Sequence, residues 1–190
     1  MITLSDIVDN TRTDKNTAHS YLDLYDTLMR PKKDSATNIL EIGIAQGGGS
    51  IKLWNDYFLN AKIYGLDIIP KDMIWQELYK LPRVTLHPST DAYNINIIRN
   101  MFPDETVKFD IVLDDGPHSL QSMVYFIKIF TPLLKDDGIL IIEDVQDYDW
   151  LEILTNVVPD ELKKFVKTYD LRKNKDRYDD IVFTINKSKI

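Results

Sequence analysis

The sequence of 190 residues has no cysteine and only three histidines, and it contains no apolar run long enough to cross a bilayer. Without cysteine there can be no disulfide framework, thiolate-ligated zinc or iron–sulfur site, or thiol nucleophile. The chain also lacks a basic excess, because 23 Lys and Arg stand against 30 Asp and Glu, a net charge of −7. Nucleic acids and anionic membranes are bound through basic faces, so we expect neither as a partner. Neither a cysteine nor a secretion signal is present, which favours a cytoplasmic protein.

What is present from residue 38 onward is an alternation of short β-branched runs with segments of helical period, typical of a parallel sheet covered by helices. The first five strands are predicted at 38–44, 62–67, 83–87, 109–113 and 138–142, the last preceded by the turn signal Asp136-Asp137-Gly138. Strands at 165–171 and 180–185, joined by a polar loop, predict an antiparallel hairpin. The expected fold is therefore α/β, a Rossmann-like doubly wound mixed sheet of seven strands.

An additional helix is predicted ahead of the first strand. Its apolar stripe contains Tyr21, Leu24, Tyr25, Leu28 and Met29, and Pro31 marks its end. We expect this helix to pack over the sheet edge or to cover the site. The whole chain, 1–190, is predicted to be one domain, with an N-terminal helical cap at 1–37 and the Rossmann-like core at 38–190.

The strongest local motif is ILEIGIAQGGGS at 39–50, where a buried strand runs through glycines into an amphipathic helix. Glycines let a ligand approach the backbone, and a helix N-terminus offers free amides. The spacing is not the dinucleotide fingerprint GxGxxG, so an ordinary tight turn is the alternative interpretation. The second strand ends in YGLDI, which places Asp67 where a carboxylate accepts hydrogen bonds from a ribose diol. Glycine turn and acid together favour an adenosine-containing ligand.

These motifs, with Trp54, Tyr57 and Phe58, resemble those of class I S-adenosylmethionine-dependent methyltransferases. More narrowly, they resemble the macrocin and mycinamicin sugar O-methyltransferases and the related cephalosporin hydroxylase-like proteins. The resemblance extends to TDKNTAHSYLDLYD at 13–26, LDDGPHS at 113–119 and IIEDVQ at 141–146. It implies that the first strand and glycine turn hold the methionine part of the cofactor and Asp67 the ribose; the residues at the matching positions are Glu41, Gly43, Ala45, Gly47, Gly48 and Ser50.

Four acids follow the fourth and fifth strands, Asp114, Asp115, Glu143 and Asp144. Neighbouring parallel strands bring their carboxyl ends to one edge, beside the cofactor crevice. Carboxylates gathered there repel one another unless some protonate or a cation binds, and oxygen ligands suit Mg²⁺. We predict Asp115, Glu143 and Asp144 as metal ligands and Asp114 as a cofactor contact, and the resemblance implies the same three ligands. The alternative is that these acids only cap helices.

His118 follows Asp115 by three residues, so the first turn of the next helix can place its imidazole beside the metal. A histidine can take a proton from a substrate hydroxyl near neutral pH. The resemblance implies that His118 is the general base, acting with Asp115. We interpret His87 as structural and His19 as a residue lining the substrate or cofactor pocket.

After the third strand the sequence HPSTDAYN replaces the acidic turn with which related enzymes contact adenine. Ser89 or Asp91 could supply that contact. The acceptor pocket is expected to use the leading segment and residues after the fifth strand, including Gln146, Tyr148 and Trp150.

The predicted function is a metal-dependent O-methyltransferase that moves a methyl group from S-adenosylmethionine to a hydroxyl of a sugar or glycoconjugate, with Mg²⁺ chelating a diol and His118 removing the proton. A catechol fits the same chemistry. A cofactor-binding module without catalysis, a nucleotide-dependent oxidoreductase or epimerase, and a nucleic-acid methyltransferase are the rivals. Related proteins often form oligomers, which leaves a homo-oligomer open.

Overall fold

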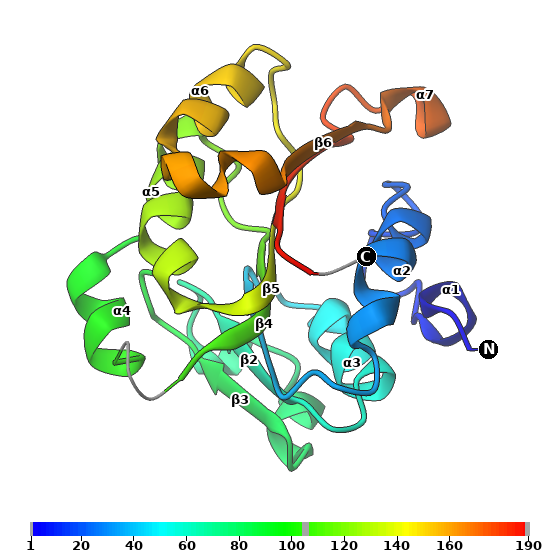
Figure 1. The fold of residues 1–190 in the computed structure, drawn as a ribbon. Coiled ribbons are helices and arrows are strands. Elements are labelled where there is room, and N and C mark those ends of the chain that lie inside the picture. Colours follow the sequence, from blue (N-terminus) through cyan, green and yellow to red (C-terminus); the bar gives the residue numbers. More distant parts are fainter. Residues whose placement is uncertain (1, 104–106, 189–190) are drawn as a thin grey trace.

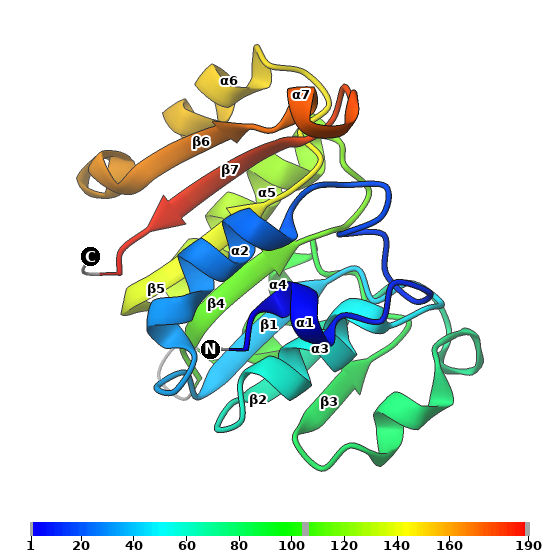
Figure 2. The ribbon, with the colours of Figure 1, turned by 90° about the vertical axis from the view of Figure 1, so that its right-hand side faces the viewer.

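The computed structural model describes residues 2–103 and 107–188, and in them a mixed seven-stranded sheet carries helices on both faces (Figures 1 and 2). Its strands are β1 (Asn38–Ile42), β2 (Lys62–Leu66), β3 (Val84–His87), β4 (Phe109–Asp114), β5 (Leu134–Ile142), β6 (Val166–Asp170) and β7 (Ile181–Asn186). Their order in the sheet is β3-β2-β1-β4-β5-β7-β6. The first five are parallel, and β7 pairs antiparallel with both β5 and β6. The predicted Rossmann-like sheet with its C-terminal hairpin is confirmed.

The helices form two layers. On one face lie α1 (Leu4–Ile7), α2 (Leu22–Met29) and α3 (Gly49–Tyr57), and on the other α4 (Ile95–Met101), α5 (Leu120–Phe130) and α6 (Trp150–Val157) (Figure 1). A short helix α7 (Arg172–Lys175) follows β6 and precedes β7 along the chain. The remaining turns of helix are of the 3-10 type, at Arg30–Lys32, Lys71–Met73, Gln76–Lys80, Thr131–Leu133 and Asp160–Phe165.

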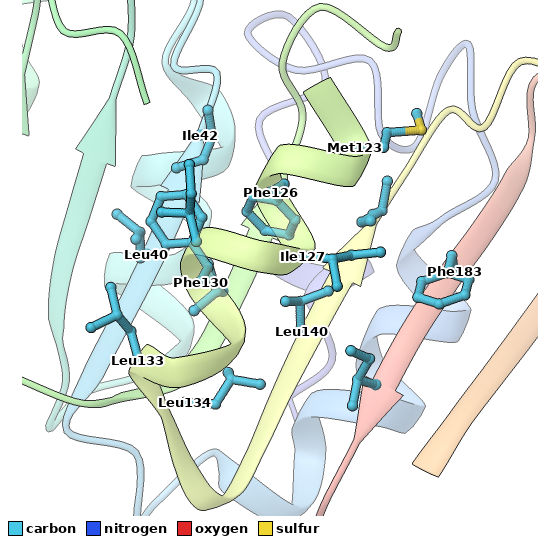
Figure 3. Close-up of a cluster of buried hydrophobic side chains, with 14 of the residues drawn as sticks. Leu40, Ile42, Met123, Phe126, Ile127, Phe130, Leu133, Leu134, Leu140 and Phe183 are labelled. Carbon is cyan, nitrogen blue, oxygen red and sulfur yellow. The ribbon is translucent and has the colours of Figure 1, made fainter. Parts of the chain in front are cut away.

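Alternating side chains of the strands feed two hydrophobic clusters, one on each face. In β1, Ile39 belongs to the cluster under α1, α2 and α3, and the next residue, Leu40, belongs to the cluster under α5. Both are fully or almost fully buried, as strands covered on two sides require. Figure 3 shows Phe126 and Phe130 of α5 directed at the sheet.

Some elements differ from their prediction. The strand β5 begins at Leu134, so Asp136 and Asp137 are part of it rather than a turn, and its pairing with β4 shifts register there. The helix α2 packs on a face of the sheet and contributes to its core, whereas an edge position was one of the two expectations (Figure 2). The other expectation, that this helix covers the site, stays a prediction. Helices α1 and α7 were not predicted, because four residues carry too little periodicity to identify a helix.

The fold brings the carboxyl ends of β1, β2, β4 and β5 together at one edge of the sheet. Four residues that follow strands at this edge have left-handed backbone conformations although they are not glycine: Ala45, Ser89, His118 and Asp144. Such conformations are uncommon and cluster at functional sites. No helix in 2–103 or 107–188 combines the length and apolarity that a membrane span requires.

Candidate functional site

The glycine turn after β1 is shaped by close approach of the chain's own backbone. Gly43 has a φ of +90°, and a Cβ built on it would lie 1.9 Å from the carbonyl oxygen of Asp115. A Cβ on Gly47 would lie 2.3 Å from the carbonyl oxygen of Arg12. We expected these glycines to let a ligand approach the backbone. In the structure, their lack of a side chain also makes room for the backbone at Asp115 and at Arg12. The segment around Arg12 therefore crosses directly over the turn.

Asp67 fixes the same turn from the end of β2. One carboxylate oxygen accepts hydrogen bonds from the amides of Ile44 and Ala45 at 2.7 and 2.8 Å. The other accepts from the amide of Ile69 at 3.0 Å. The carboxylate thus holds the turn closed, as a capping residue would, and it also borders a cavity, where a ribose diol could reach it.

Two cavities adjoin the glycine turn. The larger, of about 470 Å³, has a mainly apolar lining; Gly43, Asp67, Thr90, Asp91 and Tyr93 are among its residues. The second, of about 360 Å³, is lined by the segment from Asn10 to Asp14, Thr17, Ile44, Ala45, Gly49, Ser50 and Asp115. Ala45 and Asp115 border both cavities, so the two form neighbouring parts of one crevice at the end of β1.

Asp115, His118 and Asp144 form a cluster beside this crevice. The Nε2 atom of His118 lies 3.7 Å from Oδ1 of Asp115 and 3.6 Å from Oδ2 of Asp144. One potential ligand atom from each residue lies within 4.8 Å of the other two, which is close enough for a single cation to contact all three. Two carboxylates and one imidazole are a donor set that fits a divalent cation.

Glu143 is placed next to this cluster but deeper. Its side chain is almost fully buried, and its two oxygens accept hydrogen bonds from the ammonium of Lys15 and the hydroxyl of Tyr25. Burial, with the charges of Asp115 and Asp144, raises the pKa of Glu143 well above its ordinary value. Side chains of the protein therefore form hydrogen bonds with both oxygens of Glu143. Among the described residues, Glu143 is not part of the three-residue group around His118.

A hydrogen-bonded network from the N-terminal segment and the C-terminal hairpin supports Asp144. The hydroxyl of Tyr21 donates to its Oδ1, and His19 Nδ1 lies 3.2 Å from the same oxygen. The same ring nitrogen of His19 lies 2.6 Å from Oδ1 of the fully buried Asp180. His19 was predicted to line a pocket, but it is buried and acts within this network.

Glu41 and Asp114 lie inside the domain rather than on the crevice wall. Glu41 is fully buried, accepts a hydrogen bond from Trp54 Nε1 at 2.8 Å, and has a pKa raised by burial to about 7. Asp114 accepts a hydrogen bond from the Tyr93 hydroxyl at 2.5 Å, and burial raises its pKa to about 7 as well. Tyr93 and Asp115 line the larger cavity in place of Asp114.

The remaining predicted positions differ in whether they border one of the two cavities. Gly48 is the N-cap of α3, with a φ of +60°, and Ser50 borders the smaller cavity. Asp91 borders the larger one, next to Thr90, which we had not singled out, whereas Ser89 is exposed and does not line either cavity. His87 packs edge-on against Phe102, in agreement with its structural interpretation.

Sequence reasoning missed two side chains that contact the acids, Lys15 and Tyr93, and it missed Asp180, which contacts His19. It also treated Tyr21 and Tyr25 only as members of an apolar stripe. A signal for Lys15 existed in the segment TDKNTAHSYLDLYD, because the resemblance to the sugar O-methyltransferases includes it. Nothing in the local sequence marks Tyr93 or Asp180, whose partners are distant along the chain.

Comparison with known proteins gives sequence relatives that are sugar O-methyltransferases. The chain is 30% identical over 146 residues to the 8-demethyl-8-alpha-L-rhamnosyl tetracenomycin-C 2'-O-methyltransferase of Streptomyces olivaceus, covering 73% of this chain and 36% of that protein. It is 30% identical over 139 residues to the mycinamicin VI 2''-O-methyltransferase of Micromonospora griseorubida, covering 70% and 33%. To the demethylmacrocin O-methyltransferase of Streptomyces fradiae it is 28% identical over 138 residues, covering 70% and 33%. The chain thus spans about a third of the length of these relatives. No protein-family model matches it.

Among solved structures, the methyltransferase MycE of the mycinamycin pathway, in complex with Mg, SAH and mycinamycin VI, superposes with a TM-score of 0.70 at 20% identity, over 91% of this chain and 50% of that one. The N-methyltransferase NodS of Bradyrhizobium japonicum WM9 gives 0.56 at 15% identity, over 88% and 96%. The chain therefore has the fold of the class I S-adenosylmethionine-dependent methyltransferases. Its sequence relatives are sugar O-methyltransferases of the macrocin and mycinamicin type, which confirms the resemblance seen in its motifs.

Proposed function

We propose that this protein is an S-adenosylmethionine-dependent O-methyltransferase that acts on a sugar hydroxyl of a glycosylated small molecule. The observation that carries the proposal is the position of His118 between Asp115 and Asp144, at the rim of a crevice formed by the glycine turn and Asp67. A base, two acids and a cofactor-sized crevice are the parts that hydroxyl methylation needs. The sugar O-methyltransferases among its relatives support the sugar as acceptor.

The two cavities suit the two halves of the cofactor. The larger, apolar cavity with Asp67 and Asp91 at its wall matches an adenosine, whose base is apolar on its faces and whose ribose offers hydroxyls. The smaller, polar cavity at the N-terminus of α3 matches the amino-acid end, because free helix amides attract a carboxylate. Asp115 borders both cavities, so a methyl group at the junction would lie on the side of His118.

The carboxylates of Asp115 and Asp144 fit a divalent cation, and we propose Mg²⁺ there, with Glu143 as the further ligand that the sequence predicts and His118 beside the ion rather than bound to it. When bound, such an ion lowers the pKa of a hydroxyl that it coordinates. The protein supplies the negative charge that attracts it: Asp144 turns Oδ2 toward His118, while Tyr21 occupies Oδ1. The backbone of Asp144 is left-handed, with a φ of +55°.

His118 is the proposed proton acceptor. Its side chain is 29% exposed, so it can meet a substrate hydroxyl from solvent while Asp115 and Asp144 stabilise the positive charge that it gains. Methyl transfer also requires the acceptor oxygen to lie in line with the methyl group, which makes positioning the main task of the protein.

Exposed aromatic side chains near Asp144 provide the proposed acceptor surface. Tyr148 and Tyr178 are 52% and 63% exposed. The hydroxyl of Tyr178 donates to Gln146 Oε1 at 2.7 Å, and the amide of Gln146 donates to the main-chain oxygen of Asp144 at 2.9 Å. Tyrosine pairs an apolar ring with a hydroxyl, which matches the mixed apolar and polar surface of a sugar.

The test is methyl transfer from isotope-labelled S-adenosylmethionine to a panel of deoxysugar glycosides, with a catechol as a parallel acceptor. Labelled methyl ethers of a glycoside, formed with Mg²⁺, lost with EDTA and lost in His118→Ala, are the expected result. Transfer only to the catechol would reject the sugar. A protein that binds the cofactor but methylates neither class of acceptor would support the non-catalytic alternative.

A further inference from the structure

Among residues 2–103 and 107–188, Lys15 is the most deeply buried lysine, and it lies next to the acids. Its side chain is 1% exposed, and its ammonium lies 2.6 Å from Oδ2 of Asp115, donates to Oε1 of Glu143 and lies 3.5 Å from Oε1 of Glu41. One lysine thus faces three carboxylates. Burial by itself would lower the pKa of Lys15, but Asp115, Glu143 and Glu41 together raise it well above its ordinary value.

Asp115 and Asp144 each have one oxygen held by the N-terminal segment and one turned toward His118, whereas Glu143 is held at both oxygens. Asp115 uses Oδ2 for Lys15 and leaves Oδ1 facing His118. Asp144 uses Oδ1 for the Tyr21 hydroxyl and leaves Oδ2 facing His118. Glu143 is gripped at both oxygens, by Lys15 and by Tyr25. The N-terminal segment therefore holds one side of the acid cluster, and the opposite side is turned to the proposed reaction.

A purely stabilising role explains this arrangement poorly. A buried ion pair recovers little more than the cost of removing its charges from water, and apolar residues of similar volume often give equal or greater stability. An orienting role explains it better, because groups that hydrogen-bond to metal-ligating side chains fix their direction, and losing one such partner typically costs about 10–100-fold in metal affinity or activity.

We propose that Lys15 is a positioning residue for the divalent-cation site: it holds Asp115 so that the free Oδ1 of Asp115 is turned toward Asp144, and with Tyr25 it fixes Glu143 beside them. The inference rests on the proposed function. It assigns a role to the TDK sequence at 13–15, and it makes the segment before α2 part of the cation site although none of its residues needs to touch the ion.

The chain offers a matched control in Lys32. This lysine is 4% exposed, and its ammonium lies 2.5 Å from Oδ2 of Asp137, a carboxylate in β5 well away from the crevice. Lys15→Met and Lys32→Met therefore each remove one buried ammonium, but only the first removes it from the acid cluster.

The experiment is titration of Mn²⁺ into the wild-type protein and both variants, followed by electron paramagnetic resonance, with calorimetric titration of S-adenosylhomocysteine alongside. We expect Lys15→Met to weaken Mn²⁺ binding by about 10–100-fold. Lys32→Met should bind Mn²⁺ like the wild type, and both variants should keep the wild-type affinity for S-adenosylhomocysteine. Tyr25→Phe, which keeps the buried ring, should weaken Mn²⁺ binding in the same direction, and it serves if Lys15→Met does not fold.

Two results would overturn the inference while leaving the proposed function standing. Equal Mn²⁺ affinity of wild type, Lys15→Met and Tyr25→Phe would show that neither group positions the site. Tighter binding by Lys15→Met would show that the ammonium competes with the ion. Wild-type protein that binds S-adenosylhomocysteine but no Mn²⁺ would instead reject the metal-dependent function together with the inference.

Discussion

His118 and Asp144 both adopt left-handed backbone conformations, with φ of +52° and +55°, and their side chains meet with Nε2 and Oδ2 3.6 Å apart. The two residues follow different strands, β4 and β5, so the parallel pairing of these strands brings them together. Strained backbone at both positions indicates that the surrounding structure enforces their direction. The base and the acid of the proposed reaction are thus held in place before any substrate binds.

The first prediction concerns the base. His118→Ala should lower the rate of methyl transfer by about 10²–10⁴-fold, the usual contribution of a positioned proton acceptor. Since His118 does not line either cavity next to the glycine turn, the affinity for S-adenosylhomocysteine should not change. Steady-state kinetics and calorimetry test both parts. Wild-type turnover in the variant would remove His118 from the mechanism.

The second prediction concerns Asp67. Asp67→Asn replaces a carboxylate that accepts three amide hydrogen bonds and borders the adenosine cavity. Hydrogen bonds to charged groups contribute about 1.5–3 kcal/mol each. Losing the one from a ribose hydroxyl to the carboxylate therefore corresponds to at least about tenfold weaker binding of S-adenosylhomocysteine. Asp72→Asn, an exposed change in the segment that follows β2, is the control and should bind normally. Equal affinities would show that Asp67 only caps the turn.

The third prediction concerns the crossing of the N-terminal segment over the glycine turn. Gly47→Ala would place a methyl group 2.3 Å from the Arg12 carbonyl oxygen, so this segment must move away. We expect a loss of about 1–3 kcal/mol in the free energy of unfolding, and weaker binding of S-adenosylhomocysteine. Gly138→Ala, where the nearest atom lies at 3.0 Å, should cost less and leave binding intact. Denaturant unfolding and calorimetry on both variants would decide, and a Gly47→Ala protein indistinguishable from wild type would contradict the close approach.

The fourth prediction concerns pH. Burial raises the pKa of Glu41 from 4.5 to about 7, so the folded protein holds a proton that the unfolded chain releases in this range. The stability that the neutral carboxyl contributes is full below pH 4.5 and is lost as the pH rises to about 7.

Glu41→Gln stays neutral at every pH and should escape this loss. Relative to wild type, its free energy of unfolding should increase between pH 4.5 and 7, by up to about 3 kcal/mol at pH 8. Unfolding curves at pH 4.5, 6 and 8 measure the difference. A constant difference at all three values would mean that Glu41 is ionised in the folded protein throughout.

Much of the fold and the acid edge could be predicted from sequence because both depend on local patterns. Strand β1 is an apolar run followed by glycines, and parallel strands necessarily bring Asp115 and Glu143 to one edge. The contact between Lys15 and Asp115 could not be predicted in this way, because the two residues are 100 positions apart and meet only through packing of the N-terminal segment. The same reason explains why the close approach of Arg12 to Gly47 was not predicted, since the two segments meet only in the folded chain.

Which of two adjacent acids faces the crevice could not be predicted from the sequence either. Asp114 and Asp115 are adjacent and chemically identical, and only the direction of β4 decides that Asp115 borders the cavities while Asp114 is buried against Tyr93. A one-residue change in strand phase would exchange their roles.

The most direct test of the central claim is calorimetric titration of S-adenosylmethionine and S-adenosylhomocysteine into the full chain, with NAD⁺ as comparison and with Mg²⁺ or EDTA present. We expect saturable binding of both methionine-derived ligands at one site per chain, weakened in Asp67→Asn, and no binding of NAD⁺. Folded protein that binds neither ligand, or that binds NAD⁺ instead, would contradict the assignment as a methyltransferase.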